Sequence, residues 1–379
     1  MSVSTASDLH VRAALDRCRD VAARSGVAGV ILTQPGPVAW ATGGMNRPID
    51  RSASVDVVWL AVGLDRACVI TTNVEAPRLA AEQAPEAVGL DLVTVPWWDG
   101  PGFVGAATDA LGVPAENLGS DGHPAFSRDL SVDLTRARLA LDPWEQEQLR
   151  GLGRDAAGAV QTALREWRPG ERDSEVAARI AAEVEQVGAQ APVLLVGGDE
   201  RLRRFRHPVA VGQPLHQVVM AVLVAARGGQ HVALTRYAGT PSIEGQLAEG
   251  LAAVRRIHRR TLGACRSGVT GGAVLTELAA GYAGEDAPSA WQQHYQGGPI
   301  GYAQREFEIA PGQTSSPWWT TSLPAGCAVA WNPSLPGGPK DEDTYLVSEV
   351  EPEPITVTTD WPMADDQLPA RPAMLVTGH

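Results

Sequence analysis

Helical and strand patterns alternate along the first hundred residues, and this alternation restricts the beginning of the chain to an α/β arrangement. Residues 9–25 carry apolar side chains at helical spacing, and the apolar run at 27–34 is rich in β-branched residues. Two neighbouring strands, a helix and a further strand are expected at 55–63, 67–73, 75–83 and 90–98. The sequence therefore predicts an α/β domain over residues 1–140.

A second unit opens with a long helix at residues 141–167. Asp142 can serve as its N-cap, and Pro143 suits the first helical position because proline lacks the N–H that this position leaves unbonded. The Pro-Gly pair at 169–170 ends the helix. These signals predict a domain boundary close to residue 140.

The rest of the second unit has a mainly β pattern. A helix starting near Ser174 runs into a strand at 191–198, and one further helix is expected at about 244–265. We expect this unit to cover residues 141–362. Residues 363–379 are rich in proline and polar side chains, and they are expected to form a surface tail.

Charge and composition exclude several classes of partner. A net charge of −13 and a pI near 5.1 argue against nucleic acid or anionic membrane, because phosphate groups select basic surfaces. The four cysteines form no CxxC pair, and no apolar run has the length of a signal peptide or a membrane span. We expect a soluble, cytoplasmic protein with a small-molecule substrate. Arginine greatly outnumbers lysine, which we interpret as the coding bias of a GC-rich genome.

Four short motifs follow one another in the second unit. They are Arg-His-Pro at 206–208 after an Arg-rich segment, Ala-Leu-Thr-Arg at 233–236, HYQGGPIGY at 294–302 and GGPKDEDT at 337–344. Their order and spacing resemble those of the creatinase/aminopeptidase P/prolidase family across nearly the whole chain. The resemblance implies an α/β (α+β) chain with a creatinase-like N-terminal domain and a C-terminal pita-bread domain. It also implies a homodimer.

The resemblance further implies where a pair of metal ions would be bound. The metalloenzymes of this family use two Asp, one His and two Glu side chains, the oxygen and imidazole ligands that divalent cations need. The matching positions here are Val222, Ala233, Gly298, Asn332 and Glu342. Only Glu342 keeps a ligand of the expected type. We therefore predict that the chain uses no metal and no other cofactor.

Creatinase-like chemistry without metal would depend on acid/base groups. His207 matches the histidine to which the resemblance assigns catalysis, although it can also be a wall residue that bridges backbone groups. Glu342 would polarise a cationic group or orient water, or else form a structural salt bridge. His294 is either a second proton-transfer group or a wall residue. Glu306 joins the catalytic candidates because creatinase-like sequences also carry an Arg-Glu pair after this turn.

Cationic and amide side chains supply the candidate substrate-binding groups. Arg305 can clamp a carboxylate through two parallel hydrogen bonds, or it can form a buried structural pair. Strand alternation in the segment 201–207 would turn at least one arginine into the cavity, unless this segment is a solvated edge, and we select Arg206 because it adjoins His207. Arg47 resembles an arginine that reaches into the partner's site in creatinase-like dimers, unless its loop is an ordinary surface loop. Asn332 and Lys340 complete the set.

Two function classes remain after these observations. The first is a metal-independent hydrolase acting at a C–N bond of a small nitrogen-containing carboxylate, with lyase or isomerase chemistry as variants because they need the same proton transfers. The second is a pita-bread protein without catalysis that binds a peptide or protein. The expected presence of His207, His294, Glu306 and Glu342 around one cavity favours the enzyme, and the lost ligand positions favour the binding protein.

Overall fold

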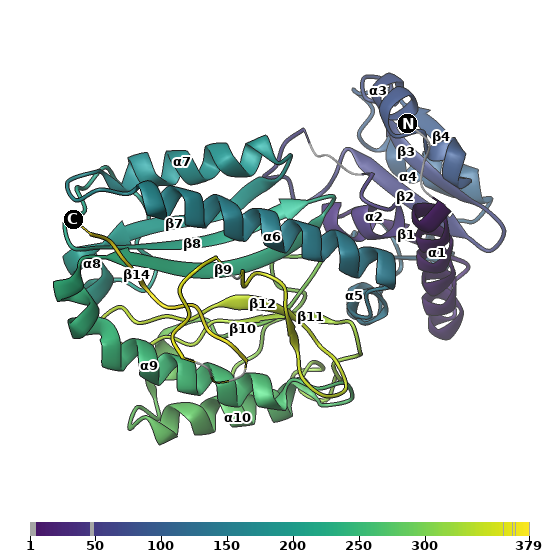
Figure 1. Cartoon of the computed structure of the whole chain (residues 1–379). Coiled ribbons are helices and arrows are strands. Elements are labelled where there is room, and N and C mark those ends of the chain that lie inside the picture. The colour runs from purple at the N-terminus through teal and green to yellow at the C-terminus, as the bar shows by residue number, and fades with distance from the viewer. Residues whose placement is uncertain (1–4, 46–48, 359, 366, 368, 379) are drawn as a thin grey trace. The chain divides into compact units, whose positions relative to one another are not determined.

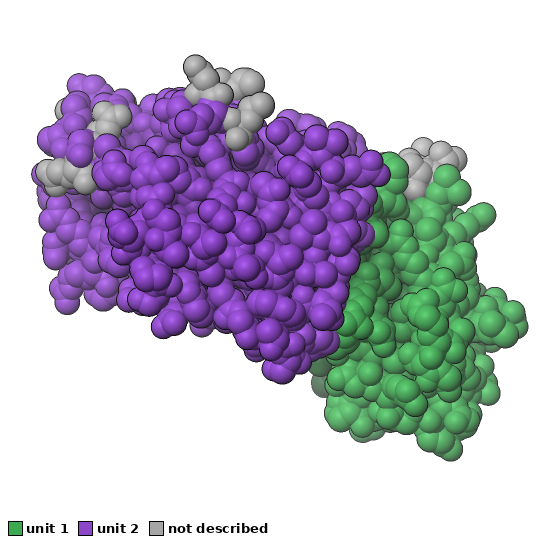
Figure 2. Space-filling model, turned by 90° about the horizontal axis from the view of Figure 1, so that it is seen from below, with its two compact units in different colours: residues 1–145, 228–230 green, residues 146–227, 231–379 purple. Residues whose placement is uncertain are grey.

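The computed structural model describes residues 5–45, 49–358, 360–365, 367 and 369–378. The chain divides into two compact units, which Figure 2 shows in different colours. Unit 1 comprises Met1–Glu145 with Gly228–Gln230, and unit 2 comprises Gln146–Arg227 with His231–His379. No helix among the described residues is long and apolar enough to cross a membrane.

Unit 1 is a six-stranded mixed sheet with helices on it (Figure 1). The strands are β1 (Gly29–Leu32), β2 (Val58–Gly63), β3 (Ala67–Thr72), β4 (Asp91–Val95), β5 (Leu118–Ser120) and β6 (Arg128–Asp129), in the order β4-β3-β2-β1-β5-β6. The helices are α1 (Thr5–Ser25), α2 (Pro35–Ala41), α3 (Ala76–Glu82), α4 (Gly102–Leu111) and α5 (Ser131–Leu139). Strands β1, β2 and β3 are buried because their runs are apolar and β-branched. The predicted α/β class is confirmed.

A reciprocal cap opens α6 (Pro143–Glu166), as the sequence predicted for Asp142. The Asp142 N–H donates to Glu145 Oε2 over 2.6 Å, and the Glu145 N–H donates to Asp142 Oδ1 over 2.9 Å. His10 bonds Asp142 Oδ2 and the Trp40 carbonyl, each over 2.7 Å, and these partners raise its pKa although burial opposes them. Among the described residues, the side chains of His10, Asp142 and Glu145 form the one group of possible metal ligands. Their bonds give the group a structural explanation.

The first sheet of unit 2 has the order β14-β9-β8-β7. Its strands are β7 (Gln190–Gly198), β8 (Val218–Arg227), β9 (Gln230–Gly239) and β14 (Leu375–Val376). Helices α6 and α7 (Asp173–Gln186) run along this sheet (Figure 1). Strand β8 is almost wholly apolar and is buried over most of its length.

The second sheet of unit 2 consists of β10 (Gly297–Ile300), β11 (Ala328–Trp331), β12 (Asp343–Leu346) and β13 (Glu353–Pro354). Helices α9 (Pro241–Ala264) and α10 (Gly271–Gly284) lie together on the other side of this sheet (Figure 1). The two sheets meet where the Thr235 N–H donates to the Glu342 carbonyl over 3.0 Å. This junction brings the fourth sequence motif close to the second.

Two local predictions in unit 2 are wrong. The Arg-rich segment was expected to be a strand, but Asp199–Arg204 forms helix α8. The Asp199 carboxylate accepts N–H bonds from residues 216–218, and the acidic residues of the first turn suit the positive helix end. Helix α10 was not expected, because its sequence is rich in glycine; the Thr270 hydroxyl caps it by accepting from the Ala273 N–H.

The expected surface tail at 363–379 is instead packed against unit 2. Strand β14 pairs in parallel with β9, Met374 joins an apolar cluster, and Arg371 is fully buried. Arg371 binds Asp341 and Asp343, about thirty residues earlier in the chain. Such a long-range ion pair leaves no local signal, so the proline-rich composition was misleading here.

Candidate active site

Two histidines from separate loops face each other in unit 2. His207 follows α8, and His294 follows a short 3₁₀ turn at Ala290–Gln293. Their Nε2 atoms are 3.1 Å apart, and the rings meet edge to face with centroids 4.8 Å apart. His294 also lines a cavity of about 600 Å³ formed by residues within 291–296 and 308–313.

The hydrogen bonds determine which nitrogen of each histidine carries a proton. His294 Nδ1 contacts the Tyr295 carbonyl, an acceptor, so this nitrogen must be the donor. A neutral imidazole has one N–H, which leaves a lone pair on His294 Nε2. His207 Nε2–H therefore donates to it, and His207 Nδ1 carries a lone pair with no hydrogen-bond partner among the described residues. This nitrogen is free to accept a proton.

The two histidines differ in their capacity to titrate. Burial, Lys340 and His207 lower the pKa of His294 to about 2, which keeps this ring neutral. Burial and Lys340 also lower the pKa of His207, while Glu342 opposes them. His207 is thus shifted toward its neutral form, whose Nδ1 lone pair can accept a proton, and His294 holds its orientation.

Lys340 lies buried beside this pair in the loop that precedes β12, with 3% of its surface exposed. Its ammonium group has no hydrogen bond or ion pair with any residue that the structure describes. Burial, together with Arg305 and Arg206, lowers the pKa of Lys340 to about 8, although Glu342 acts in the opposite direction. Sequence analysis placed Lys340 among the substrate-binding groups but missed that it is the sole lysine of the chain.

Glu342 is buried and accepts two bonds. The Thr235 hydroxyl donates to Oε2 over 3.0 Å, and Arg305 Nη2 donates to Oε1 over 3.2 Å. Arg305 Nη1 donates to its neighbour's carbonyl, that of Gln304. The Arg305 guanidinium thus forms an ion pair with Glu342. This contact corresponds to the structural pair that was the alternative to carboxylate binding.

Two further predicted substrate-binding residues hold unsatisfied polar atoms. Arg206 Nη2 donates to Gln293 Oε1 over 3.3 Å, but the buried Nη1 has no partner among the described residues. Asn332 is 5% exposed, and its Oδ1 likewise lacks a partner there. Buried polar atoms without partners are uncommon, and they mark positions where a ligand or water can bind.

The other two predicted site residues are not part of this cluster. Glu306 Oε1 accepts the Tyr302 N–H over 2.7 Å and closes the turn that starts at Gly301, which gives this carboxylate a structural role. Arg47 lies outside the described residues.

In the family that this chain resembles, five positions hold two metal ions. The side chains at the matching positions here do not suit two such ions. Val222 packs in an apolar cluster with Leu202 and Met220, and Ala233 is fully buried. The remaining carboxylate, Glu342, is occupied by an arginine. A second cation, the ammonium of Lys340, also lies near Glu342, and one carboxylate does not supply the ligand set that two divalent ions need.

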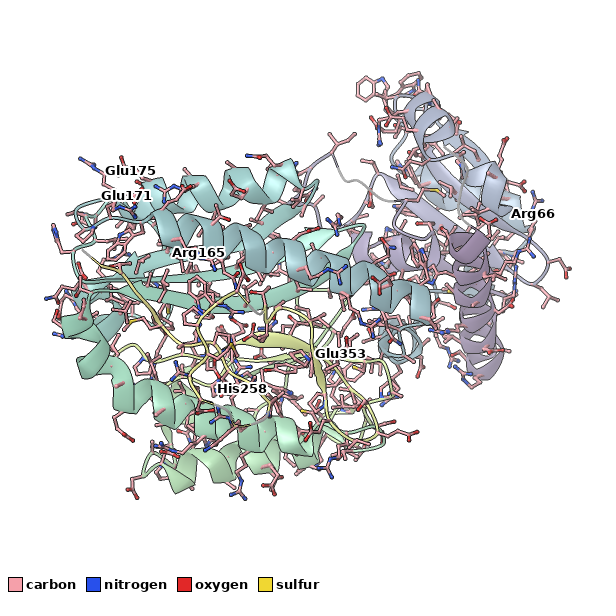
Figure 3. All side chains as sticks on the ribbon, viewed as in Figure 1. Arg66, Arg165, Glu171, Glu175, His258 and Glu353 are labelled. Carbon is pink, nitrogen blue, oxygen red and sulfur yellow. The ribbon has the colours of Figure 1, made fainter. Side chains whose placement is uncertain are left out.

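A second charged cluster is formed by the two neighbours of Glu342 in the sequence and their partners. Asp341 and Asp343 flank Glu342 in the sequence, and both bind Arg371. Asp343 also binds Arg236, and Asp341 accepts from His258 Nδ1 over 2.9 Å; Figure 3 labels His258, which extends from α9. We name this set, Asp341, Asp343, Arg236, His258 and Arg371, the rear network. It fixes the strand that presents Glu342, and sequence analysis missed it because Arg371 was assigned to a surface tail.

Comparisons with solved structures agree with this architecture. A Xaa-Pro dipeptidase from Bacillus anthracis matches with a TM-score of 0.73 and 18% identity, covering 97% of this chain and 100% of that one. A dipeptidase from Mycobacterium ulcerans matches at 0.72 with 20% identity over 97% and 98%. The N-terminal domain of the SPT16 subunit of the FACT complex from chickpea matches at 0.63 with 12% identity over 93% and 96%.

Sequence comparison alone finds no such relatives: no protein-family model and no curated protein matches the chain. The similarity therefore lies in the three-dimensional arrangement, over nearly the full length of both chains. It confirms the fold that the four motifs implied. The chain has the pita-bread fold of the prolidases and X-Pro peptidases, at a sequence identity of 14–19% to the three structures compared.

Proposed function

We propose that the chain is a metal-independent hydrolase that acts at a C–N bond of a small nitrogen-containing carboxylate. The supporting observation is the unpaired Nδ1 of His207, on a ring held through its other nitrogen by His294. Two of the similar structures are dipeptidases, which favours hydrolysis over elimination or isomerisation. All three reactions would use His207 in the same way.

His207 acts as the general base and acid in this proposal. Nδ1 takes a proton from an attacking water and returns one to the leaving nitrogen. His294 does not exchange protons near pH 7, because its pKa is about 2. A positioned acid/base group of this kind contributes roughly 10²–10⁴-fold to the rate.

The charges of the site favour an anionic substrate. Lys340 and Arg206 carry N–H groups without partners among the described residues, and buried cations are stable only when paired. A carboxylate bound between them would supply the missing acceptors. Glu342, held by Thr235 and Arg305, can then receive an ammonium or amidine nitrogen of the same molecule.

Metal independence rests on the side chains at the ligand positions. Val222 and Ala233 have no donor atoms, and the one carboxylate is bound to Arg305. We accordingly assign no step to a metal ion.

The test is a turnover assay on amide, amidine and guanidino carboxylates, with products identified by mass spectrometry. Replacing His207 by Ala should reduce kcat about 10²–10⁴-fold while the free energy of unfolding stays the same. The control is His216→Ala, which removes an exposed histidine whose N–H bond to Asp199 comes from its backbone. An unchanged rate in the His207 variant would remove this residue from the mechanism.

The similarity to a FACT subunit domain favours a second candidate, a protein that binds a peptide or protein without catalysis. This candidate predicts that members of the same panel bind and raise the Tm, yet are recovered chemically unchanged. Turnover of any member that is lost in the His207 variant decides for the enzyme.

We also propose that the functional form is a homodimer, as in the resembling family. Light scattering of the purified chain tests this assembly. If the chain is a monomer at assay concentration, the homodimer proposal is wrong, and Arg47 has no role in a partner's site.

A further inference from the structure

Lys340 is the one lysine in a chain with thirty arginines. The two side chains carry the same charge but differ in chemistry, because a guanidinium stays protonated whereas an amine can lose its proton and become a nucleophile. Coding bias explains why arginine is frequent. It does not explain why the remaining lysine is buried in the cluster that holds both histidines and Glu342.

The surroundings of Lys340 leave its amine available for reaction. Asp341, the next residue in the sequence, is bound by Arg371 and His258. Both oxygens of Glu342 are bound as well, by Thr235 and Arg305. No described residue accepts a hydrogen bond from the Lys340 nitrogen. A structural lysine buried to 3% exposure would be paired, so the missing partner points to a ligand.

We propose that Lys340 is a nucleophile that forms an imine with the carbonyl carbon of a small oxo-carboxylate. The inference uses the site of the proposed function, but it does not require that C–N hydrolysis be the reaction. The carboxylate of such a ligand would meet Arg206, whose Nη1 is buried without a partner among the described residues. The free Nδ1 of His207 lies in the same cluster and can carry the proton that the addition releases.

The covalent step balances without a metal, an oxidant or a reductant. The lone pair of neutral Lys340 Nζ forms a bond to the carbonyl carbon, and the π pair of the carbonyl moves to its oxygen. One amine proton passes through His207 Nδ1 to that oxygen. The nitrogen lone pair then forms the second C–N bond as the C–O bond breaks, and the oxygen leaves as water with the second amine proton.

The amine is also in a suitable protonation state. Burial and two arginines lower the pKa of Lys340 to about 8. At pH 7 the neutral amine is then on the order of 100-fold more abundant than for an ordinary lysine. Desolvated lysines beside other cations are a recognised type of imine-forming nucleophile.

The test is reductive trapping on the wild-type chain with glyoxylate and borohydride, followed by peptide mapping. The sole lysine makes the assay clean, because the N-terminal amine is the only other primary amine. We expect Lys340 to be labelled roughly tenfold or more faster in the folded chain than in the chain unfolded by guanidinium, with a rate that rises up to about pH 8. Excess acetate, which competes for the carboxylate position, should slow the labelling.

Two variants complete the experiment. Lys340→Arg keeps the charge and removes the amine, so labelling at this position must disappear. Gln293→Ala removes the side-chain amide that accepts from Arg206 and leaves the amine, so labelling must persist. Label confined to the N-terminus, or folded and unfolded chains labelled equally at Lys340, would overturn the inference.

These outcomes are separable from those of the proposed function. Trapping at Lys340 with full turnover in the His207→Ala variant would refute the hydrolytic mechanism alone. Turnover that needs His207 but persists in the Lys340→Arg variant, without trapping, would refute the imine alone.

Discussion

The two sides of the segment 341–343 differ in how well their charges are paired. Asp341 accepts bonds from Arg371 Nε, Arg371 Nη2 and His258, and Asp343 accepts from Arg236, Arg371 and Thr356. On the other side, Glu342 accepts one bond from Thr235 and one from Arg305. Its neighbours Lys340 and Arg206 keep N–H groups without partners among the described residues.

This difference separates structural from functional charge within one stretch of chain. Groups that only stabilise the fold gain most when every charge is paired, because a buried unpaired charge is costly. Groups that bind a ligand must leave acceptors or donors open until the ligand arrives. The rear network therefore accounts for stability, and the side that carries Glu342, Lys340 and Arg206 is the one to which we assign ligand binding.

The largest expected effect comes from breaking the rear network at Arg371. Replacing it by Met leaves Asp341 and Asp343 without their shared cation in a buried setting. We expect a loss of about 3–5 kcal/mol in the free energy of unfolding, measured by urea denaturation.

The rear network also predicts acid sensitivity. Arg371 and His258 hold the pKa of Asp341 well below its ordinary value despite its burial. A carboxyl with a depressed folded pKa stabilises the fold above its unfolded pKa of about 3.9, and this contribution is lost as the pH falls below it. If the Met variant matched the wild-type stability at pH 7, the rear network would not be structural.

Replacing Lys340 should have an intermediate effect of opposite sign, an increase in the free energy of unfolding. The unfolded chain keeps the lysine proton up to about pH 10.4, whereas the folded chain loses it near pH 8. The protonated lysine thus destabilises the fold at pH 7. Replacing it by Met should raise the free energy of unfolding by about 2–3 kcal/mol at that pH.

The same linkage gives a second readout for Lys340. Wild-type stability should rise between pH 8 and about 10.4, because the unfolded state binds the extra proton there, and the Met variant should lack this rise. Urea unfolding at pH 7, 8.5 and 10 measures both curves. A Met variant less stable than the wild type would mean that Lys340 is paired after all.

The smallest effect is expected at a solvent-exposed ion pair. Arg260 binds Glu277 over 2.8 Å on the surface of α9 and α10, and both side chains are about half exposed. Replacing Arg260 by Ala should change the free energy of unfolding by no more than about 1 kcal/mol. A change as large as that at Arg371 would show that burial does not distinguish the two pairs.

Local sequence signals predicted much of the fold. Apolar runs located strands β1 to β4 of unit 1, and the Asp142-Pro143 pair located the start of α6. Besides the unexpected helix α10, the failures were the helix at 199–204 and the packed segment 363–379. Both depend on contacts with residues distant in the sequence, which composition and periodicity do not record.

The site was only partly predictable for the same reason. Motif order located His207, His294, Lys340 and Glu342, which the structure brings into one cluster. The sequence could not separate their roles, because these follow from which nitrogen donates to which acceptor. One signal was present but unused: a single lysine in an arginine-rich chain.

The central claim is that this cluster works through His207 without a metal pair. The most direct measurement is metal analysis of protein purified without chelator, combined with turnover before and after EDTA. We predict substoichiometric metal and a rate that EDTA leaves unchanged, with loss of turnover only in the His207→Ala variant. Stoichiometric bound metal whose removal stops turnover would contradict the account.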